Sequence, residues 1–129
     1  MTVRRTPPDS HPHSVRDLCE TFGVTPRTLR YYGATELLPP HRVGDARFYS
    51  DADRARLAEI LRLKSLGLTL RAIFGLFAAQ DAGDDARRDA LLAAACVEQL
   101  ETTRRSLREL LTRGAALEAE LAELGRRAA

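Results

Sequence analysis

The C-terminal third of the chain places the strongest constraint on the fold. The segment 84–127 contains no proline and is dominated by Ala, Leu, Glu and Arg, which suit a helix. Its apolar residues follow a seven-residue repeat for more than four heptads. At about 1.5 Å per residue this helix would be roughly 65 Å long, far more than a small domain can cover. The segment is therefore predicted to be a coiled-coil helix that needs a partner helix.

Leucines occupy most of the heptad positions that would face this partner. Position a falls on Ala93, Leu100, Leu107, Gly114 and Leu121, and position d on Cys96, Thr103, Leu110, Leu117 and Leu124. The expected contact residues are Cys96, Leu100, Leu107, Leu110, Leu117, Leu121 and Leu124. A second copy of the chain is the simplest source of the partner helix, so the sequence predicts a homodimer.

Length and charge suit one small domain that carries this helix. The chain has 129 residues, which fits a compact domain plus an extension. Residues 1–80 hold twelve Arg or Lys against eight Asp or Glu, a net charge of +4, whereas residues 81–129 hold eight against ten, a net charge of −2. The basic excess favours an anionic partner for the N-terminal part. No segment resembles a membrane span or a signal peptide, so a soluble cytoplasmic protein without a membrane partner is expected.

The cysteines and histidines do not form a recognisable site. Cys19 and Cys96 are far apart and make no C-x-x-C pair, which argues against a disulfide framework and a finger-type zinc site. Cys96 occupies a d position, where a buried thiol is a more common role than a redox or metal sensor. His11 and His13 lie in residues 1–13, a polar, proline-containing segment expected to be a flexible arm. We expect no metal and no cofactor.

Residues 14–80 carry the signals of several short helices. Ser14, with Asp17 three positions later, has the spacing of a capping box, and Gly23 is expected to end the helix that follows. Thr25 is expected to cap a second helix that begins at Pro26. Two short helices joined by a tight turn around a glycine are the helix-turn-helix pattern of DNA-binding proteins.

A short hairpin is expected after these two helices. The segments 41–43 and 47–49 flank a turn at Gly44-Asp45, which predicts two strands, or a wing. Ser50 is expected to cap a third helix that ends at Gly67, and Thr69 a fourth helix. The predicted fold class is mainly α: a winged helix-turn-helix head followed by a long dimerisation helix.

Arginines and tyrosines are concentrated in the second helix. Arginine can bind guanine through O6 and N7 or hold a phosphate, and a tyrosine hydroxyl can donate to a phosphate oxygen. The alternative is that a tyrosine, above all Tyr32, packs on the third helix and that the arginines are solvated charges. The candidates for DNA contact in this helix are Arg27, Thr28, Arg30, Tyr31 and Tyr32.

Three segments in this order resemble the mercury-resistance-regulator (MerR) family of bacterial transcription regulators. They are "SVRDLCETFGVTPRTLRYY", "LLPPHRVGDARFYS" and "RLAEILRLKSLGLTLRAI", and the resemblance covers about residues 14–77. It implies a DNA-binding head over 14–80 whose second helix enters the major groove, and an antiparallel coiled coil over 84–127. Two heads would then bind a palindromic promoter element, which they bend and untwist so that RNA polymerase can engage both of its promoter elements. Besides the second-helix candidates, the match assigns DNA contacts to Arg42, Arg47 and Tyr49 in the wing and to Lys64 in the third helix.

The sequence departs from the family's pattern in two places. Gly33 stands where an acidic residue is common and Glu36 where a glycine is common, and a glycine at position 33 weakens the helix end by up to about 1 kcal/mol. The C-terminal sequence "LEAELAELGRRAA" has no Cys or His, and little chain follows the coiled coil. We therefore expect a short form that lacks a cysteine-rich or large effector domain.

Two other binding functions and an enzyme compete with this hypothesis. An excisionase-like architectural protein of phage origin would share the head and bend DNA without RNA polymerase, although such proteins are usually little more than the head. A coiled-coil interaction protein would have a basic head that does not bind DNA. An enzyme is the least supported class, because His41 has no partner group in a readable constellation and helix capping explains Asp51 and Asp53.

Overall fold

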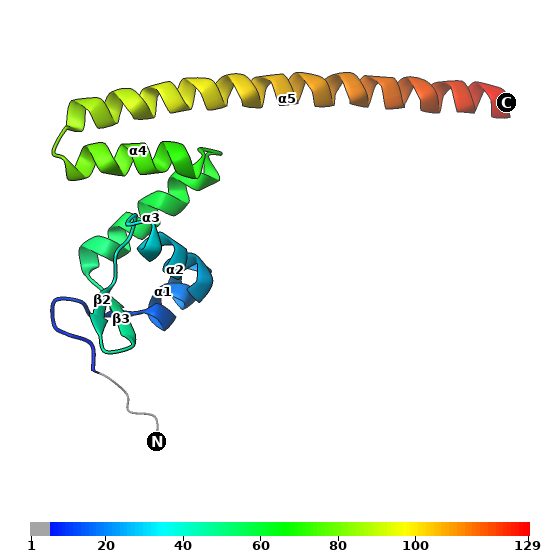
Figure 1. Cartoon of the computed structure of the whole chain (residues 1–129). Helices are drawn as coiled ribbons and strands as arrows, with labels where there is room; N and C mark the ends of the chain where they lie inside the picture. Colours follow the sequence, from blue (N-terminus) through cyan, green and yellow to red (C-terminus); the bar gives the residue numbers. More distant parts are fainter. Residues whose placement is uncertain (1–5) are drawn as a thin grey trace.

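The computed structural model describes residues 6–129 as a small head joined to a long helix (Figure 1). The first five residues of the predicted arm lie outside the described residues. Most of the described chain is helical, which confirms the predicted fold class. The elements are β1 (His13–Ser14), α1 (Val15–Phe22), α2 (Pro26–Ala34), β2 (His41–Val43), β3 (Ala46–Tyr49), α3 (Asp51–Ser65), α4 (Leu70–Asp81) and α5 (Asp85–Ala128).

Local capping groups fix the starts of the helices where the sequence predicts them. Ser14 and Ser50 each form a complete capping box, with Asp17 and Asp53 as the reciprocal partners. The hydroxyls of Thr25 and Thr69 accept the backbone N–H groups of Thr28 and Ala72 at the starts of α2 and α4. Each helix of the head therefore begins at a residue that satisfies otherwise free backbone donors.

The wing contains a third strand that the sequence analysis missed. The sheet has the order β1-β3-β2, with His13 opposite Tyr49 and His41 opposite Phe48. His13 Nε2 lies 2.6 Å from Asp51 Oδ1, and the rings of His11 and His41 stack with centroids 4.5 Å apart. The expectation of free histidines in a flexible arm is therefore wrong for His11 and His13, because strand pairing and side-chain contacts hold both against the wing.

The head has its own apolar core at the meeting of α1, α2, α3, α4 and the wing. Leu18 and Leu29 bring the two short helices together, and Leu57 and Ile60 supply the central part of α3. Ile73 and Phe77 of α4 close the far side of this core. Thirteen buried side chains form one cluster, which is the contiguous core that a small domain needs.

Gly33 and Glu36, which depart from the pattern of the resembled family, lie in the last turn of α2 and just after its end. A Cβ on Gly33 would lie 3.2 Å from Cδ of Pro40, so the lack of a side chain lets α2 and the following loop approach closely. Glu36 has a φ of 62°, a left-handed conformation that is uncommon for residues other than glycine. The helix nevertheless continues past Gly33 to Ala34.

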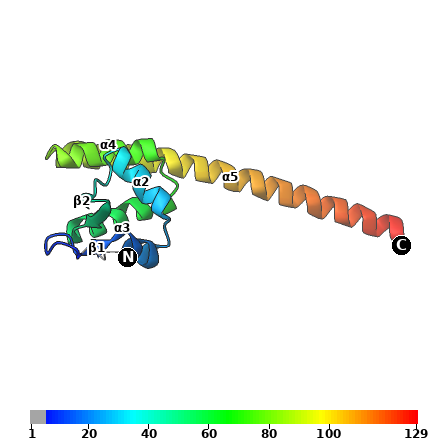
Figure 2. The ribbon, with the colours of Figure 1, turned by 60° about the horizontal axis from the view of Figure 1, so that its bottom comes forward.

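The last helix leaves the head after only part of its length. α4 and the first third of α5 form an antiparallel pair, and the rest of α5 projects as a rod (Figures 1 and 2). Leu92 and Ala95 pack against the core of the head. A Cβ on Gly67 would collide with the side chain of Gln99, so this glycine permits the close approach of α5 to the turn between α3 and α4. Within residues 6–129, no helix has the length and apolarity to cross a membrane.

Candidate nucleic-acid interface

The second helix presents cationic and aromatic side chains to solvent. Arg27 and Arg30 are exposed, and Tyr31 keeps 47% of its surface exposed. Thr28 is half-buried, and its hydroxyl lies 3.1 Å from the hydroxyl of Thr25. Neither arginine forms an ion pair with any residue in the range 6–129. Their charges are therefore free to meet an external anion.

The wing places two more arginines beside this helix. Arg42 of β2 stands directly opposite Arg47 of β3 in the antiparallel ladder, so both side chains project from the same face of the hairpin. Like charges in directly opposite positions destabilise a hairpin. Within the described part of the chain, neither guanidinium is paired with a carboxylate. A phosphate from outside the protein would relieve this repulsion.

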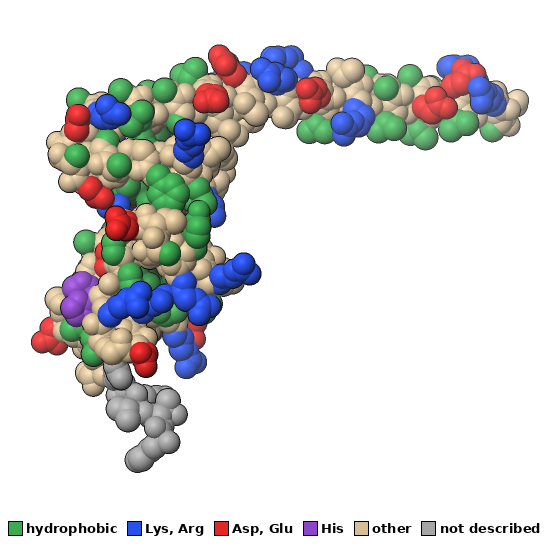
Figure 3. Space-filling view, in the orientation of Figure 1, with side chains coloured by type: hydrophobic (Ala, Val, Ile, Leu, Met, Phe, Trp, Pro, Cys, Tyr) green, Lys and Arg blue, Asp and Glu red, His purple; other side chains and the backbone are tan. Residues whose placement is uncertain are grey.

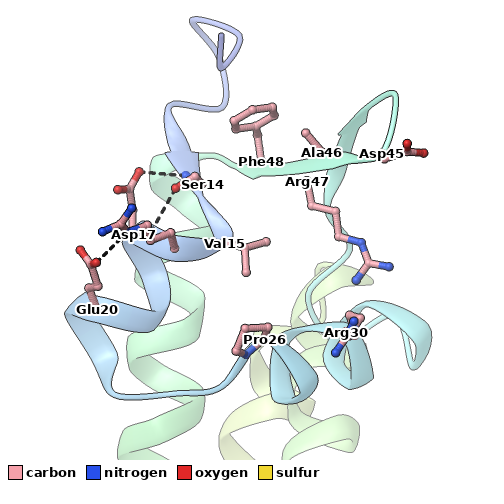
Figure 4. Close-up of a pocket in the computed structure, with 11 residues that line it drawn as sticks. Ser14, Val15, Asp17, Glu20, Pro26, Arg30, Asp45, Ala46, Arg47 and Phe48 are labelled. Atoms are coloured by element: carbon pink, nitrogen blue, oxygen red, sulfur yellow. Dashed lines mark hydrogen bonds and ion pairs between the residues drawn. The ribbon is translucent and has the colours of Figure 1, made fainter. Parts of the chain in front are cut away.

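Helix α2 and the wing meet across an open hollow of about 840 Å³. Arg30 enters it from α2 and Arg47 from β3, and the two side chains lie near each other (Figure 4). Val15, Pro26 and Phe48 supply the apolar part of the lining. The hollow thus brings together cations from two elements that are separate in the sequence.

Most acidic groups in the hollow already have partners. Asp17 accepts the backbone N–H of Ser14 at 3.0 Å, and this hydrogen bond is the main reason why the pKa of Asp17 lies below its ordinary value of 3.8. Glu20 accepts from Nε of Arg16 at 2.9 Å. These two carboxylates hydrogen-bond to groups of α1 and its N-cap. Asp45 also lines the hollow, but within residues 6–129 no ion pair joins Arg30 or Arg47 to a carboxylate.

Other cations of the head have structural partners instead. Arg56 donates from Nε to the backbone oxygen of Leu37 at 2.8 Å and from both terminal nitrogens to Asp81, at 2.6 and 2.9 Å. Its guanidinium carbon lies 4.3 Å from the ring centroid of Phe77. Arg62 pairs with Glu59 on the same helix. Sequence reasoning missed the role of Arg56, because its partner Asp81 is 25 residues away.

Two of the tyrosines assigned to DNA are buried. Tyr32 is 1% exposed and Tyr49 is 0% exposed, so neither offers a surface to DNA in this structure. Adjacent residues on a helix point about 100° apart, which is why Tyr31 faces outward while Tyr32 enters the core. The predicted contacts of Tyr32 and Tyr49 with DNA are therefore corrected to positions in the core. Lys64 is exposed, and its Nζ lies 3.4 Å from the Tyr32 hydroxyl.

The residues expected to mediate dimerisation are exposed along α5. No residue of this helix is fully buried, and its apolar side chains form a stripe on the projecting rod (Figure 3). Cys96 is a free, exposed thiol. The described chain has no group of three or more His, Cys, Asp or Glu residues placed to hold a metal ion. The exposed members of the predicted set include Leu100, Leu107, Leu110, Leu117, Leu121 and Leu124.

Comparison with known proteins identifies relatives of the head. The sequence profile of MerR HTH family regulatory proteins matches residues 13–80, which include all the proposed DNA contacts. The HTH-type transcriptional activator mta of Bacillus subtilis (strain 168) is 44% identical over 63 residues. The match spans 47% of this chain and 24% of that activator.

A solved structure of similar sequence is that of the N-terminal part of MtaN, the Bacillus subtilis multidrug transporter activator. It is 32% identical, and the superposition covers 74% of this chain and 97% of that chain with a TM-score of 0.48. The match to the curated activator thus spans about a quarter of that protein's length, and the remaining three quarters has no counterpart in the match.

Proposed function

Since the chain belongs to the MerR family of helix-turn-helix regulatory proteins, we propose that it is a dimeric transcription regulator that binds a palindromic promoter element. It would bend and untwist the DNA and so control RNA polymerase. The observation that carries the proposal is the meeting of Arg30, Arg42 and Arg47 on one face of the head without a carboxylate partner in residues 6–129.

The shape of the head suits a double-stranded ligand. The exposed side of α2 can enter a major groove, where Arg27 or Arg30 would reach a guanine edge and Tyr31 the backbone. The arginines of the wing stand next to this helix and would hold the flanking phosphates. The basic side chains gathered on one side of the head in Figure 3 agree with this arrangement.

A dimer would explain the projecting helix α5 and the choice of a palindromic site. A two-fold symmetric protein presents two copies of α2 to the DNA, and a palindrome offers the same sequence twice. Each head would hold its half-site through phosphate contacts, and these contacts would offset the deformation of the DNA between them. Bending a site of about 20–30 bp costs on the order of 1–6 kcal/mol.

The test begins by mixing the protein with sheared genomic DNA of its host and sequencing the fragments that it retains. We expect an inverted repeat that lies between the two recognition elements of a promoter. Retention without a promoter or a palindrome would favour an architectural DNA-bending protein. No retention at low salt would contradict DNA binding itself.

Substitutions then connect the retained site to the arginines. Arg30→Ala should weaken binding by about 1–3 kcal/mol if it reads a base, and Arg47→Ala should lower the salt dependence by about one unit if it holds a phosphate. Arg87→Ala is the matched control, since Arg87 is exposed at the start of α5, away from the wing. Anisotropy titrations at several salt concentrations measure both effects. Equal losses in all three variants would show only a general effect of net charge.

A further inference from the structure

We propose that His11 and His13 are positioning residues for DNA binding. They dock the described part of the N-terminal arm, residues 6–13, on the wing, which is the β2–β3 hairpin, and so hold the two wing arginines where they can meet phosphates. This inference rests on the proposed function, because it concerns how the head binds DNA. The chain has three histidines, and all three make contacts at this junction of arm and wing.

The wing needs support from another part of the chain. β2 has three residues and β3 has four, and an isolated two-stranded hairpin is at best marginally stable in water. Arg42 stands directly opposite Arg47, and this pair of like charges weakens the hairpin further. A mobile wing would also lose conformational entropy when its arginines bind phosphates, which would weaken DNA binding. A contact that holds the wing before DNA arrives therefore strengthens binding.

Strand pairing supports only one strand of the wing. β1 pairs antiparallel with β3, with His13 opposite Tyr49 and Ser14 opposite Phe48, so β3 is the central strand of three. Tyr49 is a member of the buried core and anchors β3 to the helices of the head. β2, which carries Arg42, lies at the other edge of the sheet from β1. Within the sheet, β2 is therefore held by β3 alone.

His11 connects the arm to this edge strand. Its ring stacks on the ring of His41 in β2, with the ring centroids 4.5 Å apart and an angle of 17° between the planes. The backbone N–H of His11 donates to the carbonyl oxygen of Pro8 at 2.9 Å, and Oγ of Ser10 lies 2.8 Å from Nδ1 of His11. These local hydrogen bonds fix the ring in a turn of the arm. The stack thus joins the arm to the strand with which β1 does not pair.

His13 connects the same arm to helix α3. Its Nε2 lies 2.6 Å from Oδ1 of Asp51, the first residue of α3. The side chain of His13 is only 23% exposed. Helix α3 is fixed in the head because Leu57 and Ile60 belong to the buried core. The arm therefore bridges two elements: His13 holds it to a helix of the core, and His11 holds it to the edge strand of the wing.

The histidine stack lies on the face of the wing that the arginines do not use. His41 stands opposite Phe48, and each is next in sequence to one of the opposed arginines, Arg42 and Arg47. Because successive side chains of a strand point to opposite faces, His41 and Phe48 share the face away from the arginines. Figure 4 shows Phe48 and Arg47 on opposite sides of β3. The stack can therefore hold the wing while DNA occupies the arginines.

The experiment compares four full-length proteins: the wild type, a double alanine variant, a rescue variant and a control. His11→Ala with His13→Ala removes both contacts of the arm. His11→Phe with His13→Gln keeps a ring that can stack on His41 and a side-chain N–H that can reach Asp51. Thr6→Ala is the control, since it changes an exposed side chain of the same arm. Anisotropy titrations at several salt concentrations use a fragment that the wild type retains from sheared genomic DNA. Hydrogen exchange over residues 41–49 measures the mobility of the wing without DNA, and urea unfolding measures the stability of the head.

We expect the double alanine variant to bind the fragment about 10-fold more weakly at about 0.1 M salt. The slope of log K against log salt should become shallower by up to about 1.8, which is the share of two phosphate contacts at about 0.9 each. The amides of the wing should exchange at least about 10-fold faster, because local opening becomes easier, while the urea midpoint stays near that of the wild type. The rescue variant should regain most of the affinity and the protection, and the Thr6→Ala protein should match the wild type.

Three results would overturn the positioning role. The first is unchanged affinity and unchanged exchange in the double alanine variant. The second is a loss of affinity that the rescue variant does not restore, with unchanged exchange, because it would mean that the histidines contact DNA directly. The third is a fall in the urea midpoint that accounts for the loss of affinity. If the wild type retains no DNA, the proposed function fails, and hydrogen exchange alone still decides whether the two histidines hold the wing.

Discussion

The head and the projecting part of α5 are both built from amphipathic segments, but their apolar side chains lie in opposite environments. Those of the head are buried, and those of α5 are exposed. In the head, the apolar faces of four helices and the wing bury one another, with Leu18, Leu57 and Ile73 at 0% exposure. In α5, Leu107, Leu110 and Leu121 are 55%, 58% and 69% exposed. The head buries its apolar faces within one chain, whereas the apolar stripe of α5 stays exposed in that chain. The difference teaches that an apolar stripe predicts burial only where the same chain supplies a partner.

The largest expected effect is dissociation of the proposed dimer, with the fold of the head unchanged. Leu107→Glu with Leu110→Glu would place four carboxylates on the apolar stripes of the proposed dimer. Burial of each leucine contributes about 1.5–3 kcal/mol, so the loss for four should exceed about 6 kcal/mol and give a monomer. Light scattering measures the mass, and circular dichroism should show reduced helix content.

The control for this experiment adds the same charge on the outer face of the helix. Thr112→Glu with Ala119→Glu changes two exposed f positions of the heptad and should leave the dimer intact. Equal dissociation in both proteins would show that charge alone, and not the leucine stripe, governs assembly.

The second largest expected effect destabilises the head and leaves helix α5 intact. Tyr32→Ala empties a buried position and should lower the free energy of unfolding of the head by about 3–5 kcal/mol. Tyr31→Ala changes a half-exposed neighbour and should alter stability by less than about 0.5 kcal/mol while it weakens DNA binding. Urea unfolding and anisotropy titration separate the two. A stability loss for Tyr31→Ala as large as for Tyr32→Ala would refute the assignment of one tyrosine to the surface and one to the core.

A smaller effect on stability is expected at Tyr49, and it tests whether this residue belongs to the core or to the DNA-binding surface of the head. In the described chain the buried hydroxyl of Tyr49 has no hydrogen-bond partner, and burial raises its pKa. Tyr49→Phe removes this unsatisfied group and should raise the free energy of unfolding by about 1 kcal/mol or more, with unchanged DNA affinity. Loss of affinity without loss of stability would return Tyr49 to the DNA contacts.

The smallest effect concerns Asp81, at the end of α4 where the head meets α5. The hydrogen bonds from Arg56 hold the pKa of Asp81 below its ordinary value of 3.8. Because the folded state has the lower pKa, the pair stabilises the fold above about pH 4, and this contribution is lost as the pH falls through the folded value. Wild type should therefore exceed Asp81→Asn in stability at pH 7, and the gap should shrink below pH 4. With Arg56→Ala in both proteins, the pH dependence of the gap should disappear from urea unfolding curves.

Local signals explain what the sequence predicted well. The caps at Ser14, Thr25, Ser50 and Thr69 depend on residues three positions apart, and each forms as expected. The heptad pattern likewise predicted one long helix, observed as Asp85–Ala128.

Contacts between distant residues explain what it missed. The pairing of β1 with β3 joins residues 36 positions apart at His13 and Tyr49. The salt bridge of Arg56 crosses 25 positions. Burial of Tyr49 depends on how the wing packs on the helices, and no local pattern separates it from the wing arginines. Exposure of the aromatic side chains was therefore the least predictable property of the candidate interface.

The most direct test of the central claim is the number of protein copies on one retained DNA fragment. Analytical ultracentrifugation of the wild-type protein with that fragment should give two copies per palindrome, bound together. The Leu107→Glu, Leu110→Glu protein should bind as single copies and only at much higher concentration. A wild-type complex with one copy per site, or equal affinity of the two proteins, would contradict the account of two heads joined by α5.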